Sequence, residues 1–160
     1  MLPIFERNRA RQVFMERKDF ILKCGQWCVS AVVGGSLLQA CSTTYYATNT
    51  MNGNILSFSK KEFQEVRKDG QTRQRKFVLL RSLRLNYPIC VFALGDDRYS
   101  ALLMVCTHNA CELNPTGDYL ICPCHGSEFN NTGKVQNPPA EIDLQSFKVT
   151  HDENNIHVHL

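Results

Sequence analysis

Two short strings in the second half of the chain gather six of its thirteen cysteine and histidine side chains. The first occupies residues 106–111 (CTHNAC) and the second occupies residues 122–127 (CPCHGS). Cysteine thiolates and histidine imidazoles are the side chains that bind soft and borderline transition metals. Each string offers two thiols and one imidazole, so together they predict a metal centre held between two loops.

Two kinds of centre can use these ligands. A structural zinc site would take one Cys and one His from each string in tetrahedral coordination. A pair of irons bridged by two sulfides needs two ligands per iron, and two thiolates with two imidazoles also meet that need. Both centres leave two cysteines of the strings unused, so the ligand types alone do not decide between them, and the spacing of the residues does.

The spacing of four of these residues is specific. Cys-x-His is followed by thirteen residues and then by Cys-x-x-His, which closely resembles the signature of the Rieske family. The resemblance implies one [2Fe–2S] cluster, with Cys106 and Cys122 on one iron and His108 and His125 on the other. The histidine-bound iron would lie at the tip of the domain, nearest to an electron donor or acceptor.

The two additional cysteines make the chain resemble one branch of the Rieske family in particular. Cys111 and Cys124 match the respiratory, high-potential branch of the Rieske family, in which such a pair forms a disulfide between the two cluster loops. Ring-hydroxylase ferredoxins have the four ligands but lack this pair. The resemblance therefore implies a Cys111–Cys124 disulfide, and disulfides persist in oxidising compartments.

Ser127 and Phe129 are the positions that the resemblance marks as tuning the cluster. In respiratory Rieske proteins the serine hydroxyl donates a hydrogen bond to a bridging sulfide. That branch often has a tyrosine two positions later, whose hydroxyl bonds a ligand sulfur, whereas this chain has Phe129. Hydrogen bonds to sulfur raise the reduction potential, so we expect a positive or near-zero potential below the top of the Rieske range.

The remaining patterned sequence predicts an all-β fold. Several segments rich in Val, Ile, Leu, Phe and Tyr are bounded by turn residues, as β-strands are. They occupy residues 77–85, 89–94, 99–105, 119–121, 144–150 and 156–160. Short strands at this spacing, with a hairpin turn at residues 95–97, predict an antiparallel β-sandwich or small barrel. The resemblance adds a cluster-binding subdomain formed by two loops, with residues 133–140 as a third loop over the cluster.

The first forty residues resemble an export signal. A basic stretch at residues 17–23 (RKDFILK) precedes an apolar run at residues 27–38, which is short for a membrane span. The basic stretch resembles a twin-arginine motif with Lys18 in place of the second arginine, and ordinary Sec export is the alternative. Met15 lies directly before this motif and is a candidate for the true start.

The apolar run ends in LQAC at residues 38–41, which resembles a bacterial lipobox. This predicts a lipoprotein that is modified at Cys41 and held on the periplasmic side of a bacterial membrane. A retained N-terminal membrane helix is the alternative. Residues 41–54 are polar and without clear periodicity, so we expect a tether there, between the lipid and a domain at residues 55–160.

Charge is distributed unevenly along the chain. There are 18 Lys and Arg against 15 Asp and Glu, but the whole excess lies in residues 1–40 and gives no ground for nucleic-acid binding. Residues 60–84 carry nine basic and three acidic side chains, whereas residues 96–160 carry three and nine. The pattern predicts either two solvated faces or an acidic region that steers a basic redox partner towards the cluster.

These residues together predict one-electron transfer by an exported protein. No nucleophile–base pair outside the two strings suggests catalysis by the isolated chain. The chain could be a free-standing carrier or the small subunit of a periplasmic oxidoreductase, with a redox protein as its partner. It could also be the Rieske subunit of a quinol-oxidising cytochrome bc-type complex. The lack of a clear retained helix and hinge in the sequence favours the carrier.

Overall fold

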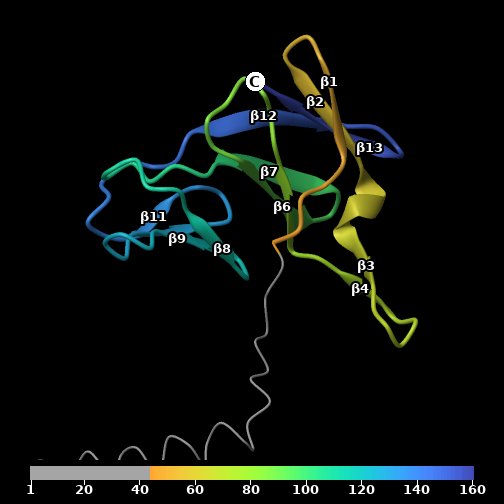
Figure 1. Ribbon diagram of the computed structural model, residues 1–160, viewed down its shortest axis with the longest axis horizontal. Coiled ribbons are helices and arrows are strands. Elements are labelled where there is room, and N and C mark those ends of the chain that lie inside the picture. The colour runs from red at the N-terminus through yellow and green to blue at the C-terminus, as the bar shows by residue number, and fades with distance from the viewer. Residues whose placement is uncertain (1–43) are drawn as a thin grey trace, which may run out of the picture. The chain divides into compact units, whose positions relative to one another are not determined.

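Thirteen strands form three antiparallel sheets in residues 44–160, the part of the chain that the computed structural model describes (Figure 1). The strands are β1 (Asn49–Asn52), β2 (Ile55–Ser59), β3 (Gln64–Val66), β4 (Thr72–Gln74), β5 (Phe77–Leu80), β6 (Ile89–Gly95), β7 (Arg98–Leu103), β8 (Asn114–Thr116), β9 (Tyr119–Ile121), β10 (Glu128–Asn130), β11 (Val135–Asn137), β12 (Ser146–His151) and β13 (Asn155–His159). A single 3₁₀ turn, η1 (Lys60–Phe63), follows β2. The predicted all-β class is confirmed.

The largest sheet has seven strands in the order β1-β2-β13-β12-β7-β6-β5. Its β6–β7 hairpin turns at Asp96 and Asp97, which have positive φ values of 51° and 56°, a conformation that aspartate tolerates better than most residues. The hairpin turn expected at residues 95–97 is therefore present. Tyr46, just before β1, pairs with Leu79 of β5 at the opposite edge. One segment thus joins both edges and curls the sheet towards the expected small barrel.

Strand β6 separates two hydrophobic cores. Ile89 and Val91 pack in one buried cluster, while Cys90 and Phe92 pack in the other. Successive side chains of a strand point to opposite faces of its sheet, so both faces of β6 are covered. This explains the unbroken apolar run in the sequence of β6, because a strand covered on both faces shows no alternation of polar residues.

The second of these hydrophobic clusters, which we call the interface core, connects the seven-stranded sheet to the two Cys/His strings. Its members are Leu79, Cys90, Phe92, Leu102, Met104, Cys106, Leu113, Leu120, Cys122, Phe129, Ala140 and Leu144. The four-stranded sheet β11-β10-β9-β8 contributes Leu120 and Phe129 to it. Gly133 of the β10–β11 turn lies so close to Leu102 that a Cβ on it would come within 2.9 Å of Leu102 Cδ2. The small sheet is therefore packed firmly against β7.

The expected tether at residues 41–54 is wrong where the structure describes it from Tyr46 onwards, because Tyr46 pairs with Leu79 of β5 and β1 follows. Residues 49–52 form β1, which pairs with β2 through a turn that contains Gly53 at a positive φ of 58°. β1 is an edge strand whose side chains are mostly exposed, and such a strand needs no apolar alternation. The predicted export signal and Cys41 lie outside the described residues. Within residues 44–160 no helix is long and apolar enough to cross a membrane.

Candidate metal centre

The two Cys/His strings fold into loops of the same design. In loop 1 (residues 106–111) the N–H of the first residue donates to the C=O of the sixth at 2.8 Å, and the N–H of the fifth donates to the C=O of the first at 2.9 Å. In loop 2 (residues 122–127) the same two bonds measure 2.8 and 3.0 Å. The fifth residue has positive φ in both loops, 51° at Ala110 and 79° at Gly126. The backbone therefore presents the first cysteine of each loop in an equivalent way.

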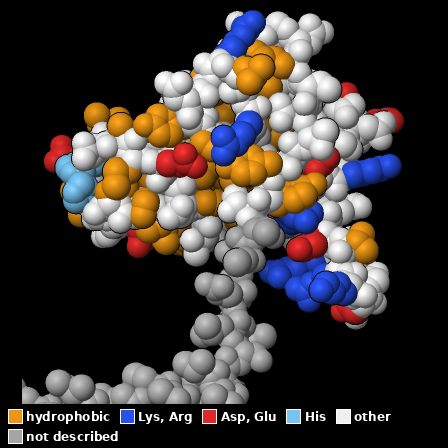
Figure 2. Space-filling model, viewed as in Figure 1, with side chains coloured by type: hydrophobic (Ala, Val, Ile, Leu, Met, Phe, Trp, Pro, Cys, Tyr) orange, Lys and Arg blue, Asp and Glu red, His pale blue; other side chains and the backbone are white. Residues whose placement is uncertain are grey.

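The four predicted ligands come together with thiols inside and imidazoles outside. Cys106 and Cys122 are each only 2% exposed and belong to the interface core. His108 and His125 are exposed, and their ring centroids are 5.1 Å apart with the ring planes perpendicular. Figure 2 shows histidine side chains at the surface at one end of the described part, the end that carries the four-stranded sheet in Figure 1.

Hydrogen bonds favour the thiolate form of Cys106. Burial acts to raise the pKa of this thiol, but the backbone N–H groups of His108 and Asn109 and the side chains of two further residues lower it. Those two side chains are Cys122 and Ser127, both in loop 2. The net effect is a pKa below the usual thiol value. The thiolate is the form of cysteine that binds metal, so the loops are arranged to supply a ligand.

Ser127 is the one polar side chain that is fully buried in residues 44–160. Its Oγ accepts a hydrogen bond from the Ala140 N–H at 3.0 Å, which leaves its own proton free to be donated towards the sulfur of Cys106. A buried hydroxyl needs such a partner to offset its lost hydration. Phe129, two positions further on, is also fully buried and has no hydroxyl to donate.

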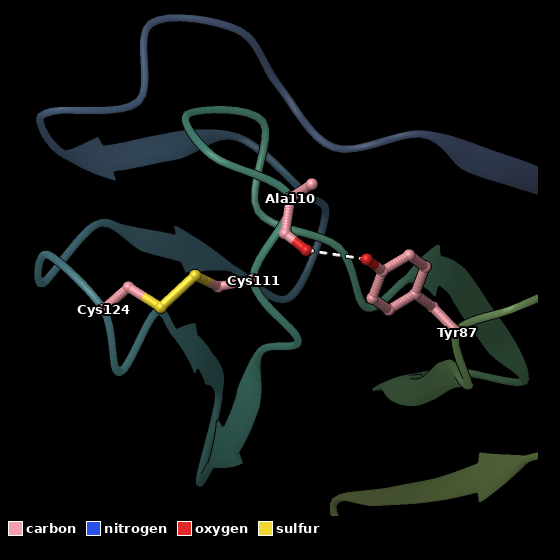
Figure 3. The surroundings of a disulfide bond; sticks show 4 residues. All are labelled: Tyr87, Ala110, Cys111 and Cys124. Atoms are coloured by element: carbon pink, nitrogen blue, oxygen red, sulfur yellow. Dashed lines mark hydrogen bonds between the residues drawn. A yellow bond between two sulfur atoms is a disulfide. The ribbon is translucent and has the colours of Figure 1, made fainter.

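A disulfide between Cys111 and Cys124 joins loop 1 to loop 2 (Figure 3), as the family resemblance implied. The sulfur of Cys122 lies within 4.8 Å of both disulfide sulfurs, so the disulfide lies directly beside a predicted ligand. The disulfide uses two of the four cysteines in the loops, so Cys106 and Cys122 remain there as free thiols. Cys90 is also free but is buried in β6, where burial raises the pKa of its thiol well above the usual value.

A third segment, residues 137–142, contacts both loops. Thr107 of loop 1 donates its hydroxyl to the Ile142 C=O at 2.6 Å. The Asn137 side chain donates to the Gly126 C=O of loop 2 at 3.1 Å. These bonds, together with the Ala140 N–H, place the end of the expected third loop against the centre. The three segments hold one another, so the positions of the ligands do not depend on a single contact.

Tyr87 supports loop 1, and the sequence alone did not mark it. Its hydroxyl donates to the Ala110 C=O at 2.7 Å (Figure 3). Ala110 is the positive-φ residue of loop 1, and a non-glycine residue in that conformation needs support from its surroundings. Tyr87 precedes Pro88 in the connection between β5 and β6, a position that reads as an ordinary turn. No local signal separates it from the other tyrosines of the sequence.

Replacing Tyr87 with Phe is expected to lower the free energy of unfolding by about 1 kcal/mol, the usual net value of one hydrogen bond. Urea denaturation of the variant and of the parent protein measures the difference. Tyr119→Phe is the matched control, because Tyr119 is 47% exposed. Equal denaturation midpoints for the two variants would contradict a supporting role for Tyr87.

Comparison with known proteins identifies the family. Residues 58–148 match the Rieske [2Fe-2S] domain. The cytochrome b6-f complex iron-sulfur subunit of Prochlorococcus marinus is 33% identical over 75 residues, which cover 44% of this chain and 42% of that protein. The ubiquinol-cytochrome c reductase iron-sulfur subunit of Rickettsia typhi is 38% identical over 53 residues, 31% of this chain and 30% of that protein.

Among solved structures, a plasma membrane Rieske protein from Synechocystis is 34% identical, with a TM-score of 0.48, and the match covers 53% of this chain and 87% of that one. The chain spans less than half the length of the curated relatives that it matches. The domain match nevertheless covers more than half of this chain and includes both loops. The chain therefore belongs to the Rieske [2Fe–2S] domain family.

Proposed function

We propose that this protein carries single electrons on a [2Fe–2S] cluster held by Cys106, Cys122, His108 and His125. Domains of this family hold one such cluster, which supplies a one-electron couple when bound. The observation that carries the proposal is the arrangement of the four side chains, with two buried thiols behind two exposed imidazoles. That arrangement places the histidine ligands where a redox partner can approach them.

The surrounding residues fit the cluster. The donor set of two free thiols and two imidazoles is the one that distinguishes Rieske centres from all-cysteine clusters. The backbone N–H groups near Cys106 and the hydroxyl of Ser127 point to the sulfur side of the site. Such donors favour the more negative, reduced state of a cluster. The loops therefore offer both the ligands and the polar groups that a cluster needs.

A redox titration tests this function. Purified protein, reconstituted with iron and sulfide, is titrated anaerobically with dithionite and then reoxidised while its visible spectrum is recorded. We expect uptake of one electron per chain and full recovery on reoxidation. A protein that binds zinc in preference to iron, or that takes up no electron, would exclude the proposed function.

We further propose that the protein is exported and anchored through a lipid at Cys41 on the periplasmic side of a bacterial membrane. The lipobox-like LQAC at residues 38–41 supports this, with an export signal in residues 1–40. The Cys111–Cys124 disulfide supports an oxidising compartment. Mass spectrometry of the mature protein distinguishes the alternatives, because a lipoprotein begins at an acylated Cys41 and a retained anchor keeps residues 1–40.

The partner is proposed to be a redox protein that docks at the histidine end of the domain. The second candidate is a quinol-oxidising cytochrome bc-type complex, of which this chain would be the Rieske subunit. The names of the relatives in Prochlorococcus and Rickettsia, both iron–sulfur subunits of such complexes, favour that candidate. Co-purification from detergent-solubilised membranes decides between them, since a complex subunit brings a b-type cytochrome with it.

Ser127→Ala is expected to lower the reduction potential of the cluster. A hydrogen bond to a charged group is worth about 1.5–3 kcal/mol, which corresponds to roughly 60–130 mV for one electron. Protein-film voltammetry measures the shift. Ser146→Ala, at an exposed position of β12, is the control and should leave the potential unchanged. An unchanged potential in Ser127→Ala would contradict a hydrogen bond from the Ser127 hydroxyl to a sulfur of the centre.

A further inference from the structure

The β3–β4 hairpin carries three exposed cations that the electron-transfer site does not use, against two carboxylates, Glu65 opposite Arg73 and Asp69 in the turn. Arg67, Lys68 and Arg73 are exposed on it, and within residues 44–160 none of the three forms an ion pair. The one carboxylate of the turn, Asp69, accepts the Gln71 N–H at 2.9 Å. Figure 2 shows Lys and Arg side chains gathered over this hairpin, on the opposite side of the described part from the histidines.

An exposed aliphatic side chain lies beside these cations. Val66, the last residue of β3, is 74% exposed. It is followed directly by Arg67 and Lys68, which begin the turn between the two strands. The turn has a defined shape, because the Arg67 N–H donates to the Gln71 C=O and the Gly70 N–H donates to the Arg67 C=O, each at 2.9 Å. Interfacial amphipathic helices combine apolar side chains with cations in the headgroup layer of a membrane, and the hairpin tip offers the same two kinds of side chain on a smaller scale.

The base of the hairpin lies where the chain enters the described fold. The guanidinium of Arg75 stacks on the ring of Tyr45 at 3.9 Å from its centroid, and the Tyr45 hydroxyl hydrogen-bonds the Glu62 carboxylate. Arg75 also donates to the Gln64 C=O at 2.7 Å, which fixes the base of β3. Tyr45, near the start of the described residues, therefore lies at the base of this hairpin.

The maximum span of the chain from Cys41 to Tyr45 and the length of the hairpin are similar. Cys41 precedes Tyr45 by four residues, which span at most about 14 Å when fully extended. The hairpin runs from Gln64 to its turn at Asp69, about 17 Å at the rise of a β-strand. A membrane to which Cys41 is fixed therefore lies within reach of the tip of the hairpin.

We propose that the tip of the β3–β4 hairpin, formed by Val66, Arg67, Lys68 and Arg73, binds the anionic phospholipid headgroups of the membrane that carries the anchor. This rests on the proposed lipid anchor at Cys41. Each Lys or Arg near an anionic leaflet contributes about fivefold to the binding constant. A domain held at Tyr45 and at the hairpin presents its histidine end away from the membrane-bound side, free to meet a redox partner.

The experiment uses the full-length protein reconstituted through its own anchor into vesicles. One vesicle type is phosphatidylcholine, and the other adds phosphatidylglycerol. An environment-sensitive fluorophore on Val66→Cys reports contact with the bilayer through quenching by spin-labelled lipid. The same label on Asn52→Cys, the last residue of β1, is the positional control. We expect quenching at position 66 only in the anionic vesicles, and we expect it to fall as salt is added.

Charge reversal identifies the contact. Arg67→Glu with Lys68→Glu is expected to reduce binding of the hairpin to anionic lipid by at least roughly 30-fold, the loss of two cations alone, and to abolish the quenching. Arg98→Glu with Lys148→Glu makes the same change in net charge elsewhere on the exposed surface and is expected to preserve it. Quenching that survives reversal at the hairpin, or hairpin variants that lose only their reaction with an acidic redox protein, would overturn the proposal.

Absence of the lipid anchor gives a different result from absence of the hairpin contact. A protein without an anchor does not float with neutral vesicles, whereas an anchored protein without the hairpin contact floats with both vesicle types and shows no quenching at position 66. The visible spectrum of the cluster confirms in each case that the variant is folded.

Discussion

His125→Ser is expected to abolish the Rieske spectrum and to reduce bound iron at least tenfold. The imidazole of His125 lies beside that of His108, with ring centroids 5.1 Å apart, and the proposed iron needs both. Serine has no imidazole nitrogen to offer in its place. A cluster that lacks one of its four protein ligands is exposed to water on that side, because both histidines lie at the surface.

The same substitution should leave the β-fold intact. Loop 2 is closed by backbone hydrogen bonds between Cys122, Gly126 and Ser127, and the imidazole takes no part in them. Far-ultraviolet circular dichroism of the variant should therefore match that of the cluster-free parent protein. His151→Ser is the control, because His151 is exposed at the end of β12. A His125→Ser protein with an unchanged cluster spectrum would show that His125 is not a ligand.

Replacing Cys111 and Cys124 together by Ser is expected to lower the free energy of unfolding by about 3 kcal/mol. The disulfide closes a loop with a sequence separation of 13, and the chain-entropy estimate for a loop of this length is about 3 kcal/mol. Because this disulfide joins the two ligand loops beside Cys122, the variant should also lose its cluster several-fold faster on dilution.

Denaturation in urea and the decay of visible absorbance measure these two effects. Each single variant, Cys111→Ser and Cys124→Ser, should behave like the double variant, since either one removes the bond. Cys90→Ala is the control for loss of a thiol, because Cys90 of β6 is a free thiol that takes no part in the disulfide. A double variant that retains its cluster as long as the parent would contradict the role given to the disulfide.

The candidate ligands could be read from the sequence because their chemistry is local. Cys-x-His and Cys-x-x-His each lie within one six-residue loop, and the backbone bonds that shape those loops are also local. The Cys111–Cys124 disulfide joins the loops as the family resemblance implied. The burial of Cys106 and Cys122 behind exposed imidazoles also agrees with an electron-accepting tip.

Contacts between distant segments could not be predicted in this way. Tyr87 reaches Ala110 across 23 residues, and Ala140 reaches Ser127 across 13, and neither pair has a sequence pattern of its own. β1 was missed for a different reason, since an exposed edge strand lacks the alternation by which strands are recognised. The folded unit therefore includes residues before β1, among them Tyr46, which pairs with Leu79.

Electron paramagnetic resonance of the purified, dithionite-reduced protein tests most directly whether two cysteines and two histidines hold the cluster. We predict the low average g value of a Rieske centre, together with hyperfine couplings from two inequivalent imidazole nitrogens, which His108→Ser and His125→Ser should remove. An average g value typical of an all-cysteine [2Fe–2S] cluster, without nitrogen coupling, would contradict this ligand set.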